Sequence, residues 1–280
     1  MPATATKKSI ESDSTLTDVL IIGAGFAGLS AARMLESVGI SVRVVEARNR
    51  VGGRTLTREV EGVCFDLGAQ WIGPGQERLR KLARDLGMAT FPTHCDGSKI
   101  LNLSGRVSTY NSKIPSFSIP NLALLQGALV FLDFARKLVD PNCPSQAPGA
   151  SKWEKMSLEE FKQKLVPSED VRAVFDVAVR VIFGEEPRNI SLLSFLAYIN
   201  AGGGFLKLVE IKDGAQQERF VEGVQRASIR MAESLKGELV LGAPVRLVQQ
   251  MEEGVIVASG ERTFRASYVI SCVPIPLLSK

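Results

Sequence analysis

Residues 19–28 read Val-Leu-Ile-Ile-Gly-Ala-Gly-Phe-Ala-Gly, and this stretch decides the fold. Its four leading apolar residues are typical of a buried parallel strand, and the three glycines have the GxGxxG spacing of dinucleotide-binding folds. We expect a helix over 29–38, which Gly39 ends, and a second buried strand over 42–45 that leads to Glu46. The order of strand, glycine turn, helix, strand and acidic residue predicts a dinucleotide-binding unit.

Each glycine of this motif has a physical role. Gly23 permits the tight turn out of the strand, Gly25 lets the backbone approach a pyrophosphate, and Gly28 allows close packing of helix and strand. The helix N-terminus presents free N–H groups and a positive dipole end to the phosphates. Glu46 lies 18 residues beyond Gly28, where a carboxylate can accept hydrogen bonds from ribose hydroxyls. The alternative is a structural turn that binds no ligand.

A second glycine motif, Val51-Gly52-Gly53-Arg54, follows within a few residues. Together with residues 46–50 it resembles the Glu-Ala-Arg-x-Arg-x-Gly-Gly-Arg signature of FAD-containing amine oxidases, the monoamine oxidase family. The resemblance implies that these glycines pass against the cofactor diphosphate and that the arginines add charge-assisted bonds to it. It favours FAD over NAD, although an NAD-dependent oxidoreductase with the same fingerprint is the alternative.

The resemblance continues in Asp66-Leu-Gly-Ala-Gln-Trp-Ile-Gly-Pro74, which in the family lies along the flavin ring. Ala69 stands here in place of a second glycine, and the alternative is a core loop with Trp71 as a structural aromatic residue. Backbone groups at Val245 would hold the adenine, and Pro274 would pass over the cofactor. The expected cofactor-binding residues are Gly23, Gly25, Phe26, Ala27, Gly28, Glu46, Ala47, Arg48, Gly52, Gly53, Arg54, Leu67, Gly68, Ala69, Gln70, Trp71, Val245 and Pro274.

Residues 202–223 also match the family in order and spacing, with Glu222 in place of one glycine of its Gly-Gly turn. The resemblance places Gln216 beside the substrate, and Val181 and Val209 on the walls of the same cavity. Apolar walls with one amide would suit a neutral amine. The alternative is that the two valines are ordinary core residues.

Composition narrows the class of protein. The 280 residues are 45% hydrophobic and 23% charged, which indicates a globular chain, and the net charge of +4 gives no sign of nucleic-acid binding. The single histidine, His94, has no nearby acidic partner, and the four cysteines are widely spaced. We therefore expect no metal site and no catalytic nucleophile or strong base in this chain.

Local patterns predict several further elements. We expect a hairpin of two strands over 55–59 and 63–66 with a turn at 61–62, and a second hairpin around Ser104 and Gly105. Ser168 is expected to cap a helix that runs to residue 182. Further strands are expected over 244–249, 254–258, 263–265 and 268–272.

We expect an α/β fold, in which a Rossmann-like FAD-binding domain carries an inserted, mixed α+β substrate domain. The first segment of the FAD-binding domain would span residues 18–97, the partial substrate domain 98–215, and the second FAD-binding segment 216–280. Residues 1–17 lack the apolar core of a signal peptide and are expected to form a disordered tail. The longest apolar run, over 122–134, is too short to span a bilayer, so we expect no membrane span.

The resemblance ends near residue 276, whereas family members continue further, so we expect an N-terminal fragment or truncated form that lacks part of the fold. The implied reaction converts an amine, dioxygen and water to an aldehyde, ammonia and hydrogen peroxide. A polyamine or L-amino-acid oxidase is an alternative, but Arg180 and Arg188 are poor candidates for a carboxylate-binding arginine. A non-catalytic FAD-binding remnant is another. We expect a cytoplasmic or other intracellular location and a possible homodimer.

Overall fold

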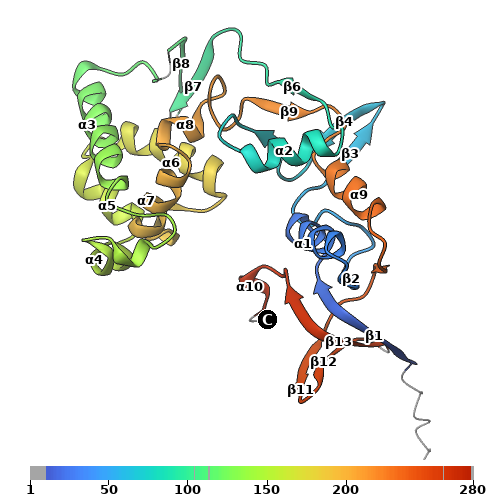
Figure 1. The fold of residues 1–280 in the computed structure, drawn as a ribbon. Helices are drawn as coiled ribbons and strands as arrows, with labels where there is room; N and C mark the ends of the chain where they lie inside the picture. Colours follow the sequence, from blue (N-terminus) through green and yellow to red (C-terminus); the bar gives the residue numbers. More distant parts are fainter. Residues whose placement is uncertain (1–10, 104, 113, 261, 279–280) are drawn as a thin grey trace, which may run out of the picture. The chain divides into compact units, whose positions relative to one another are not determined.

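The computed structural model describes residues 11–103, 105–112, 114–260 and 262–278, without the side chains of 11–15. The chain divides into two compact units, which are described separately below (Figure 1). The first unit comprises Met1–Gln70, Lys81–Ala89 and Phe220–Lys280, and the second comprises Trp71–Arg80 and Thr90–Arg219. The chain passes from the first unit to the second near residue 89 and returns near residue 219, whereas we expected these passages at 97 and 215. Residues 71–80 also belong to the second unit.

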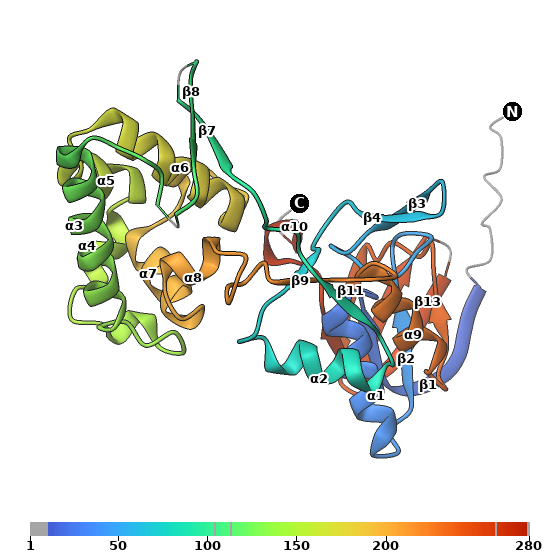
Figure 2. The same ribbon diagram turned by 90° about the horizontal axis from the view of Figure 1, so that it is seen from above.

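A six-stranded sheet organises the first unit, with the order β10-β2-β1-β13-β12-β11 (Figure 2). The first four strands in this order, β10, β2, β1 and β13, pair in parallel. The pairings of β13 with β12 and of β12 with β11 are antiparallel. The strands are β1 (Glu11–Ile22), β2 (Val42–Val45), β10 (Leu239–Val240), β11 (Leu247–Met251), β12 (Gly254–Ser259) and β13 (Arg262–Ser271). This mixed sheet with a parallel part confirms the predicted α/β, Rossmann-like fold.

Both faces of β1 are buried over residues 19–22, which explains the continuous apolar run there. Val19 and Ile21 pack in a cluster with α1 (Phe26–Ser37) and α9 (Gln225–Glu233). Leu20 and Ile22 point to the opposite face, where they pack in a separate cluster with residues of β12 and β13. Because successive side chains of a strand alternate between faces, one apolar run supplies both cores.

Three predicted boundaries in the first unit are wrong. Residues 11–17, which we expected in a disordered tail, are the first part of β1 and pair with β13, while residues 1–10 lie outside the described part of the chain. The expected strand over 244–249 begins only at Leu247. The two short strands expected over 263–272 form one strand, β13. The bounds of β1 and β13 are set by their pairing with each other across about 250 residues, which local sequence does not reveal. The start of β11 is set by its pairing with the neighbouring strand β12, a pairing that begins at Leu247 and Ala258.

The remaining elements of the first unit are short. A hairpin joins β3 (Thr57–Val60) to β4 (Val63–Asp66), and its turn at Glu61 and Gly62 has positive φ at both residues, as a two-residue hairpin turn requires. The chain also contains α2 (Glu77–Asp85), whose two ends fall in different units, and α10 (Ile275–Leu278).

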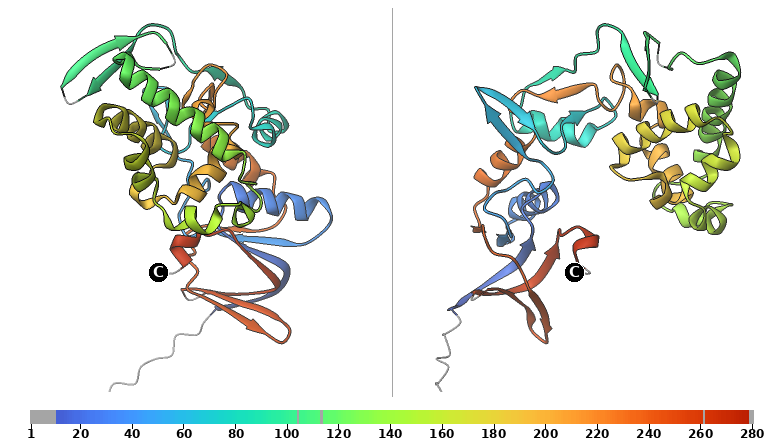
Figure 3. Two further views of the ribbon diagram at one scale, coloured as in Figure 1. Left: turned by 90° about the vertical axis from the view of Figure 1, so that its left-hand side faces the viewer. Right: turned by 180° about the vertical axis from the view of Figure 1, so that it is seen from behind.

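The second unit combines helices with two small sheets (Figure 3). One sheet has the order β5-β9-β6, and the hairpin β7-β8 forms the other; Ser104 of its expected turn lies outside the described residues. The strands are β5 (Trp71–Ile72), β6 (Thr90–Pro92), β7 (Lys99–Leu103), β8 (Arg106–Tyr110) and β9 (Glu218–Phe220). The helices are α3 (Ile119–Arg136), α4 (Ala150–Lys155), α5 (Leu158–Leu165), α6 (Glu169–Phe183), α7 (Leu192–Ala201) and α8 (Phe205–Val209), with 3-10 turns at Pro144–Gln146 and Pro187–Asn189.

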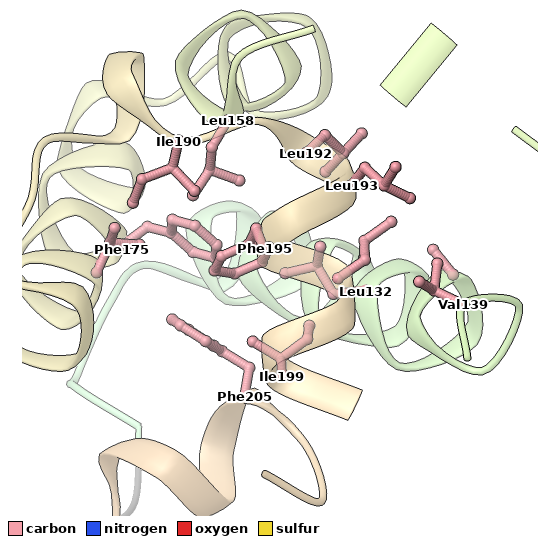
Figure 4. Close-up of a cluster of buried hydrophobic side chains, with 13 residues drawn as sticks. Leu132, Val139, Leu158, Phe175, Ile190, Leu192, Leu193, Phe195, Ile199 and Phe205 are labelled. Atoms are coloured by element: carbon pink, nitrogen blue, oxygen red, sulfur yellow. The ribbon is translucent and has the colours of Figure 1, made fainter. Parts of the chain in front are cut away.

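An aromatic cluster holds the helices of the second unit together (Figure 4). Phe195 of α7 is fully buried, and its ring lies near those of Phe175 on α6 and Phe205 on α8. The rings of Phe175 and Phe205 stack at 4.8 Å. Serine side chains cap the starts of α5, α6 and α7, as the sequence predicted for α6. The helices therefore begin at fixed residues and share one core.

Among the described helices, α3 alone is long and apolar enough to cross a membrane, judged by length and composition. At 18 residues it is longer than the apolar run that we recognised in the sequence. Leu125, Ala128, Leu132 and Ala135 are buried along one side of it. Leu132 and Ala135 belong to the same cluster as Phe195, so this side of α3 is part of the core of the unit.

We expect Phe195→Ala to lower the free energy of unfolding by about 3–5 kcal/mol, because it leaves a cavity in the aromatic cluster. Val130→Ala on α3, whose valine is 58% exposed, should change it by less than about 0.5 kcal/mol. Urea denaturation followed by circular dichroism measures both variants. Equal stabilities for the two variants would contradict the assignment of this core.

Candidate functional site

The glycine motif folds into a turn that joins β1 directly to α1. Gly23 has a φ of +108°, which only glycine adopts readily, and its N–H donates to the carbonyl of Val45 at 2.8 Å. A Cβ atom on Gly28 would lie 1.9 Å from the carbonyl oxygen of Gly23. Gly28 is therefore required for α1 to pack on the turn, as the spacing predicted.

The start of α1 offers backbone donors. Gly25 is the N-cap residue, and the first bond of the helix runs from the N–H of Leu29 to the carbonyl of Gly25. The N–H groups of Phe26, Ala27 and Gly28 precede this bond, so they have no partner within the helix. Together with the helix dipole, they suit an anion such as a diphosphate.

The second glycine motif lies against the first. Gly52 and Gly53 have φ of +109° and +56°, and the N–H of Gly52 donates to the carbonyl of Ala24 at 2.8 Å. A Cβ atom on Gly53 would lie 3.3 Å from the Cα of Gly25, and one on Gly25 would lie 3.8 Å from the Cα of Gly53. Two backbones meet here without side chains between them, which is the cradle that a diphosphate needs.

Glu46 is buried at the end of β2, and two backbone donors fix its carboxylate. One oxygen accepts from the N–H of Ala24 at 2.8 Å and the other from the N–H of Arg48 at 2.9 Å. An ionised carboxylate has about four acceptor sites, so capacity is left for ribose hydroxyls. Glu46 thus fixes the first glycine turn through the Ala24 N–H, and its carboxylate can still accept hydrogen bonds from a ribose.

The three arginines in and just before the second motif, Arg48, Arg50 and Arg54, differ in what they contact. Arg50, which we did not predict as a site residue, donates to the carbonyls of Val51, Gly53 and Thr55 at 3.1–3.2 Å and so fixes the shape of the loop. Arg48 and Arg54 are exposed. Exposed guanidinium groups on this loop suit the predicted charge-assisted bonds to an anion, whereas Arg50 serves the loop itself.

The segment after the β3-β4 hairpin also contacts the second motif. The N–H of Ala69 donates to the carbonyl of Arg54 at 3.3 Å, and a Cβ on Gly68 would lie 2.2 Å from the same oxygen. Leu67 is 65% exposed, and Gln70 is partly buried. Glycine at 68 is therefore required by the protein backbone, while the roles of Leu67 and Gln70 toward a flavin stay predictions.

Two further predicted segments reach the carboxyl ends of the parallel strands. The N–H of Ala243 donates to the carbonyl of Glu46, and that of Gly242 to the carbonyl of Arg48, so the segment before half-buried Val245 lies beside residues 46–48. The N–H of Cys272 donates to the carbonyl of Ile22, and exposed Pro274 follows. Ligands of open α/β sheets bind at this edge.

The predicted substrate residues and Trp71 belong to the second unit. Trp71 pairs with Arg219 across β5 and β9, so it is part of a small sheet as well as a predicted cofactor contact. Val181 on α6 is 52% exposed, and Val209, the last residue of α8, is half-buried. Exposure of Val181 argues against its being an ordinary core residue of this unit. The substrate roles stay predictions.

A tight turn fixes the backbone that carries Gln216. Its N–H donates to the carbonyl of Glu210, and a Cβ on Gly214 would lie 2.0 Å from that oxygen. Glu218, which follows in β9, accepts from the Arg80 guanidinium at 2.9 Å, and this hydrogen bond holds the pKa of its carboxyl below its usual range. The half-buried Gln216 therefore projects from a rigid turn.

The structure also bears on the residues for which we expected no role. Within the described ranges no group of three or more histidine, cysteine, aspartate or glutamate residues could hold a metal ion, and Cys64, Cys95, Cys143 and Cys272 are free thiols. Arg180 pairs with Glu186 through two hydrogen bonds of 2.8 and 2.9 Å, which raise the pKa of its guanidinium. A paired Arg180 is a weaker candidate for binding a substrate carboxylate.

Comparison with known proteins decides the family. Residues 26–280 match the family of flavin-containing amine oxidoreductases. The chain belongs to this family. The family uses FAD, which confirms the predicted cofactor, and the grouping of both glycine motifs and Glu46 at one edge of the sheet fits the ADP half of that cofactor.

The relatives of this chain include bacterial and animal proteins. The chain is 36% identical over 257 residues to AofH of Mycobacterium tuberculosis, assigned as a flavin-containing monoamine oxidase, and covers 57% of that protein. It is 31% identical over 260 residues to human flavin-containing amine oxidase B, with 92% of this chain and 50% of that protein aligned. The chain thus spans about half the length of these relatives.

Solved structures of the same family have closely similar folds. Putrescine oxidase bound to putrescine superposes with a TM-score of 0.88 at 30% identity, covering 95% of this chain and 60% of that one. Cyclohexylamine oxidase from Brevibacterium oxydans has a TM-score of 0.85 at 30% identity, covering 91% of this chain and 57% of that one. Both comparisons confirm the predicted fold class.

The Gly25→Val variant of this chain should fold but fail to retain FAD. The φ of Gly25 is −85°, which any residue adopts, but the valine methyl groups would occupy the space between the two glycine backbones. Gly75→Val is the control, because a Cβ there meets nothing within 4 Å. FAD content per chain after gel filtration measures the effect, and equal FAD content in the two variants would remove Gly25 from the site.

Glu46→Gln should weaken FAD binding about tenfold or more, equal to roughly 1.4 kcal/mol, and lower the free energy of unfolding by about 1–3 kcal/mol. The new amide group would turn an N–H toward a backbone N–H donor. Glu36→Gln is the matched control, because that carboxylate also accepts from two backbone N–H groups, those of Lys236 and Gly237, at the other end of α1. Titration calorimetry with FAD separates the two carboxylates; equal losses of affinity would show that Glu46 acts only through stability.

Proposed function

We propose that the protein to which this chain belongs is a flavin-dependent amine oxidase. The reaction removes a hydride equivalent from the carbon next to the amine nitrogen and a proton from that nitrogen, and water hydrolyses the resulting imine to an aldehyde and ammonia. FAD, when bound, supplies the chemistry that accepts the two electrons and delivers them to dioxygen, with hydrogen peroxide as product.

One structural observation supports the cofactor part of this proposal, and the family match supports the amine substrate. The observation is the close approach of Gly53 to Gly25, where a Cβ atom added to Gly53 would lie 3.3 Å from the Cα of Gly25. The first motif alone suits any dinucleotide. The second motif, with its paired glycines and exposed Arg48 and Arg54, adds a diphosphate cradle of the kind that the family resemblance implies.

The two units would divide the work. The first unit would hold the cofactor, with the N-terminus of α1 at the diphosphate and Glu46 at the ribose. The second unit would orient the amine, with Val181 and Val209 as apolar walls and the amide of Gln216 as a hydrogen-bonding group. No side chain of this chain is required as a nucleophile, since the electrons leave through the cofactor. The homodimer, the location and the absence of nucleic-acid partners stay predictions.

A polyamine substrate is the second candidate, because putrescine oxidase is among the structural relatives. A diamine would require an acceptor for its second ammonium group in addition to an apolar wall. An amino-acid substrate is less well supported, since Arg180 is already paired with Glu186.

The chain spans about half of its relatives, so the proposal concerns the whole protein, and binding is tested separately from catalysis. The purified chain should bind FAD and show absorption bands at about 370 and 450 nm. The corresponding Gly25→Val chain is the control for specific binding. A colourless chain that takes up no added FAD would contradict the holo-flavoprotein assignment.

A peroxide-coupled assay of the purified, FAD-loaded chain with benzylamine, putrescine and an L-amino acid then tests catalysis. We expect peroxide with benzylamine if the substrate is a monoamine, and a preference for putrescine would support the polyamine alternative. Bound flavin without peroxide from any of the three would favour a non-catalytic FAD-binding chain. Catalase should abolish the signal, which controls for other oxidants.

A further inference from the structure

Gln225 is a buried side chain, 8% exposed, at the first position of α9, and its amide joins two segments that lie far away in the sequence. The Nε2 group donates to the carbonyl of Val51 at 2.8 Å, across 174 residues. The Oε1 atom accepts from the N–H of Thr57 at 2.9 Å, across 168 residues. The amide therefore connects the start of α9 to both ends of the loop 51–57.

The hairpin side of this connection has further bonds. The Thr57 hydroxyl accepts from the Gln225 backbone N–H at 3.2 Å and donates to the Asp66 carboxylate at 2.6 Å. The same carboxylate oxygen accepts from the N–H of Val224 at 3.0 Å. The start of α9 is thus tied to β3 and β4 independently of the loop.

The loop side depends on Gln225 more directly. A Cβ on Gly52 would lie 3.1 Å from the Cγ of Gln225, so the glycine packs on the stem of this side chain. Arg50 also donates to the Val51 carbonyl, but it belongs to the loop and fixes only the internal shape. The Gln225 amide adds directional bonds to the apolar cluster that Val51 shares with Met231 of α9, and so fixes where the loop lies relative to this helix.

We propose that Gln225 is a positioning residue for the cofactor, which holds the 51–55 loop so that Gly53 meets Gly25. The inference rests on the proposed function, because it gives the loop the diphosphate as its ligand. The amide suits this role because it combines a donor and an acceptor in one group. A carboxylate would lack the donor, and an aliphatic side chain would lack both.

Two variants test the role. Gln225→Leu removes both hydrogen bonds at similar size, and Gln225→Glu keeps the acceptor for Thr57 while it removes the donor to Val51. Val257→Ala, in the fully buried centre of β12, is the control that destabilises the first unit without touching the loop. If Gln225→Leu does not fold, Gln225→Glu still provides the comparison.

Hydrogen exchange of the FAD-free chain is the first measurement. We expect the amides of residues 51–55, including the Gly52 N–H that bonds to Ala24, to exchange about tenfold faster in the Gln225 variants than in Val257→Ala. Exchange in β2, which lies outside the segments to which Gln225 hydrogen-bonds, should match the control. Loop exchange equal to that of Val257→Ala would overturn the proposal.

Affinity for FAD, from the quenching of flavin fluorescence, is the second measurement. We expect a dissociation constant about tenfold higher in the Gln225 variants than in Val257→Ala. Faster loop exchange with unchanged affinity would overturn the positioning role. If the unmodified chain bound no FAD, the proposed function would fail, and the exchange measurement would still decide whether Gln225 holds the loop.

Discussion

The close approach of two glycine backbones, at Gly25 and Gly53, is the constraint on which the site depends. A Cβ atom on Gly53 would be tight against Gly25 at 3.3 Å, and one on Gly25 would be in van der Waals contact with Gly53 at 3.8 Å, so little space separates the two backbones. The constraint explains why both motifs are needed: the first turn sets the start of α1, and the loop at 52–53 covers it. The bond from the Gly52 N–H to the Ala24 carbonyl fixes the two at hydrogen-bond distance.

Three polar side chains outside the two glycine motifs support this close approach. Glu46 holds the Ala24 N–H from one side, and Gln225 holds the Val51 carbonyl from the other. Arg50 closes the loop on itself. Each of these groups is polar and at least partly buried, so leaving one unpaired would cost more than the bond itself contributes. The cradle is therefore rigid because its polar groups satisfy one another.

Local patterns were enough to predict part of this arrangement. The buried strand β2, the hairpin of β3 and β4, and the glycines of the first turn follow from runs of a few residues, and the structure has them at or near the expected positions. Gln225 and the early start of β1 could not be predicted in this way. Their partners, Val51 and β13, lie 174 and about 250 residues away, and no local periodicity reports such a pairing.

The distribution of the supports between the units has a functional consequence. Glu46, Gly53 and Gln225, with every partner named for them, lie in the first unit, whereas Gln216 is fixed by Glu210 of the second. The glycine cradle and the turn that carries Gln216 thus have separate structural supports. Under the proposed function, a substitution near Gln216 would change the choice of amine without loosening the cradle. Such independence would let one cofactor-binding unit serve oxidases for different amines, such as the putrescine and cyclohexylamine oxidases among the solved relatives.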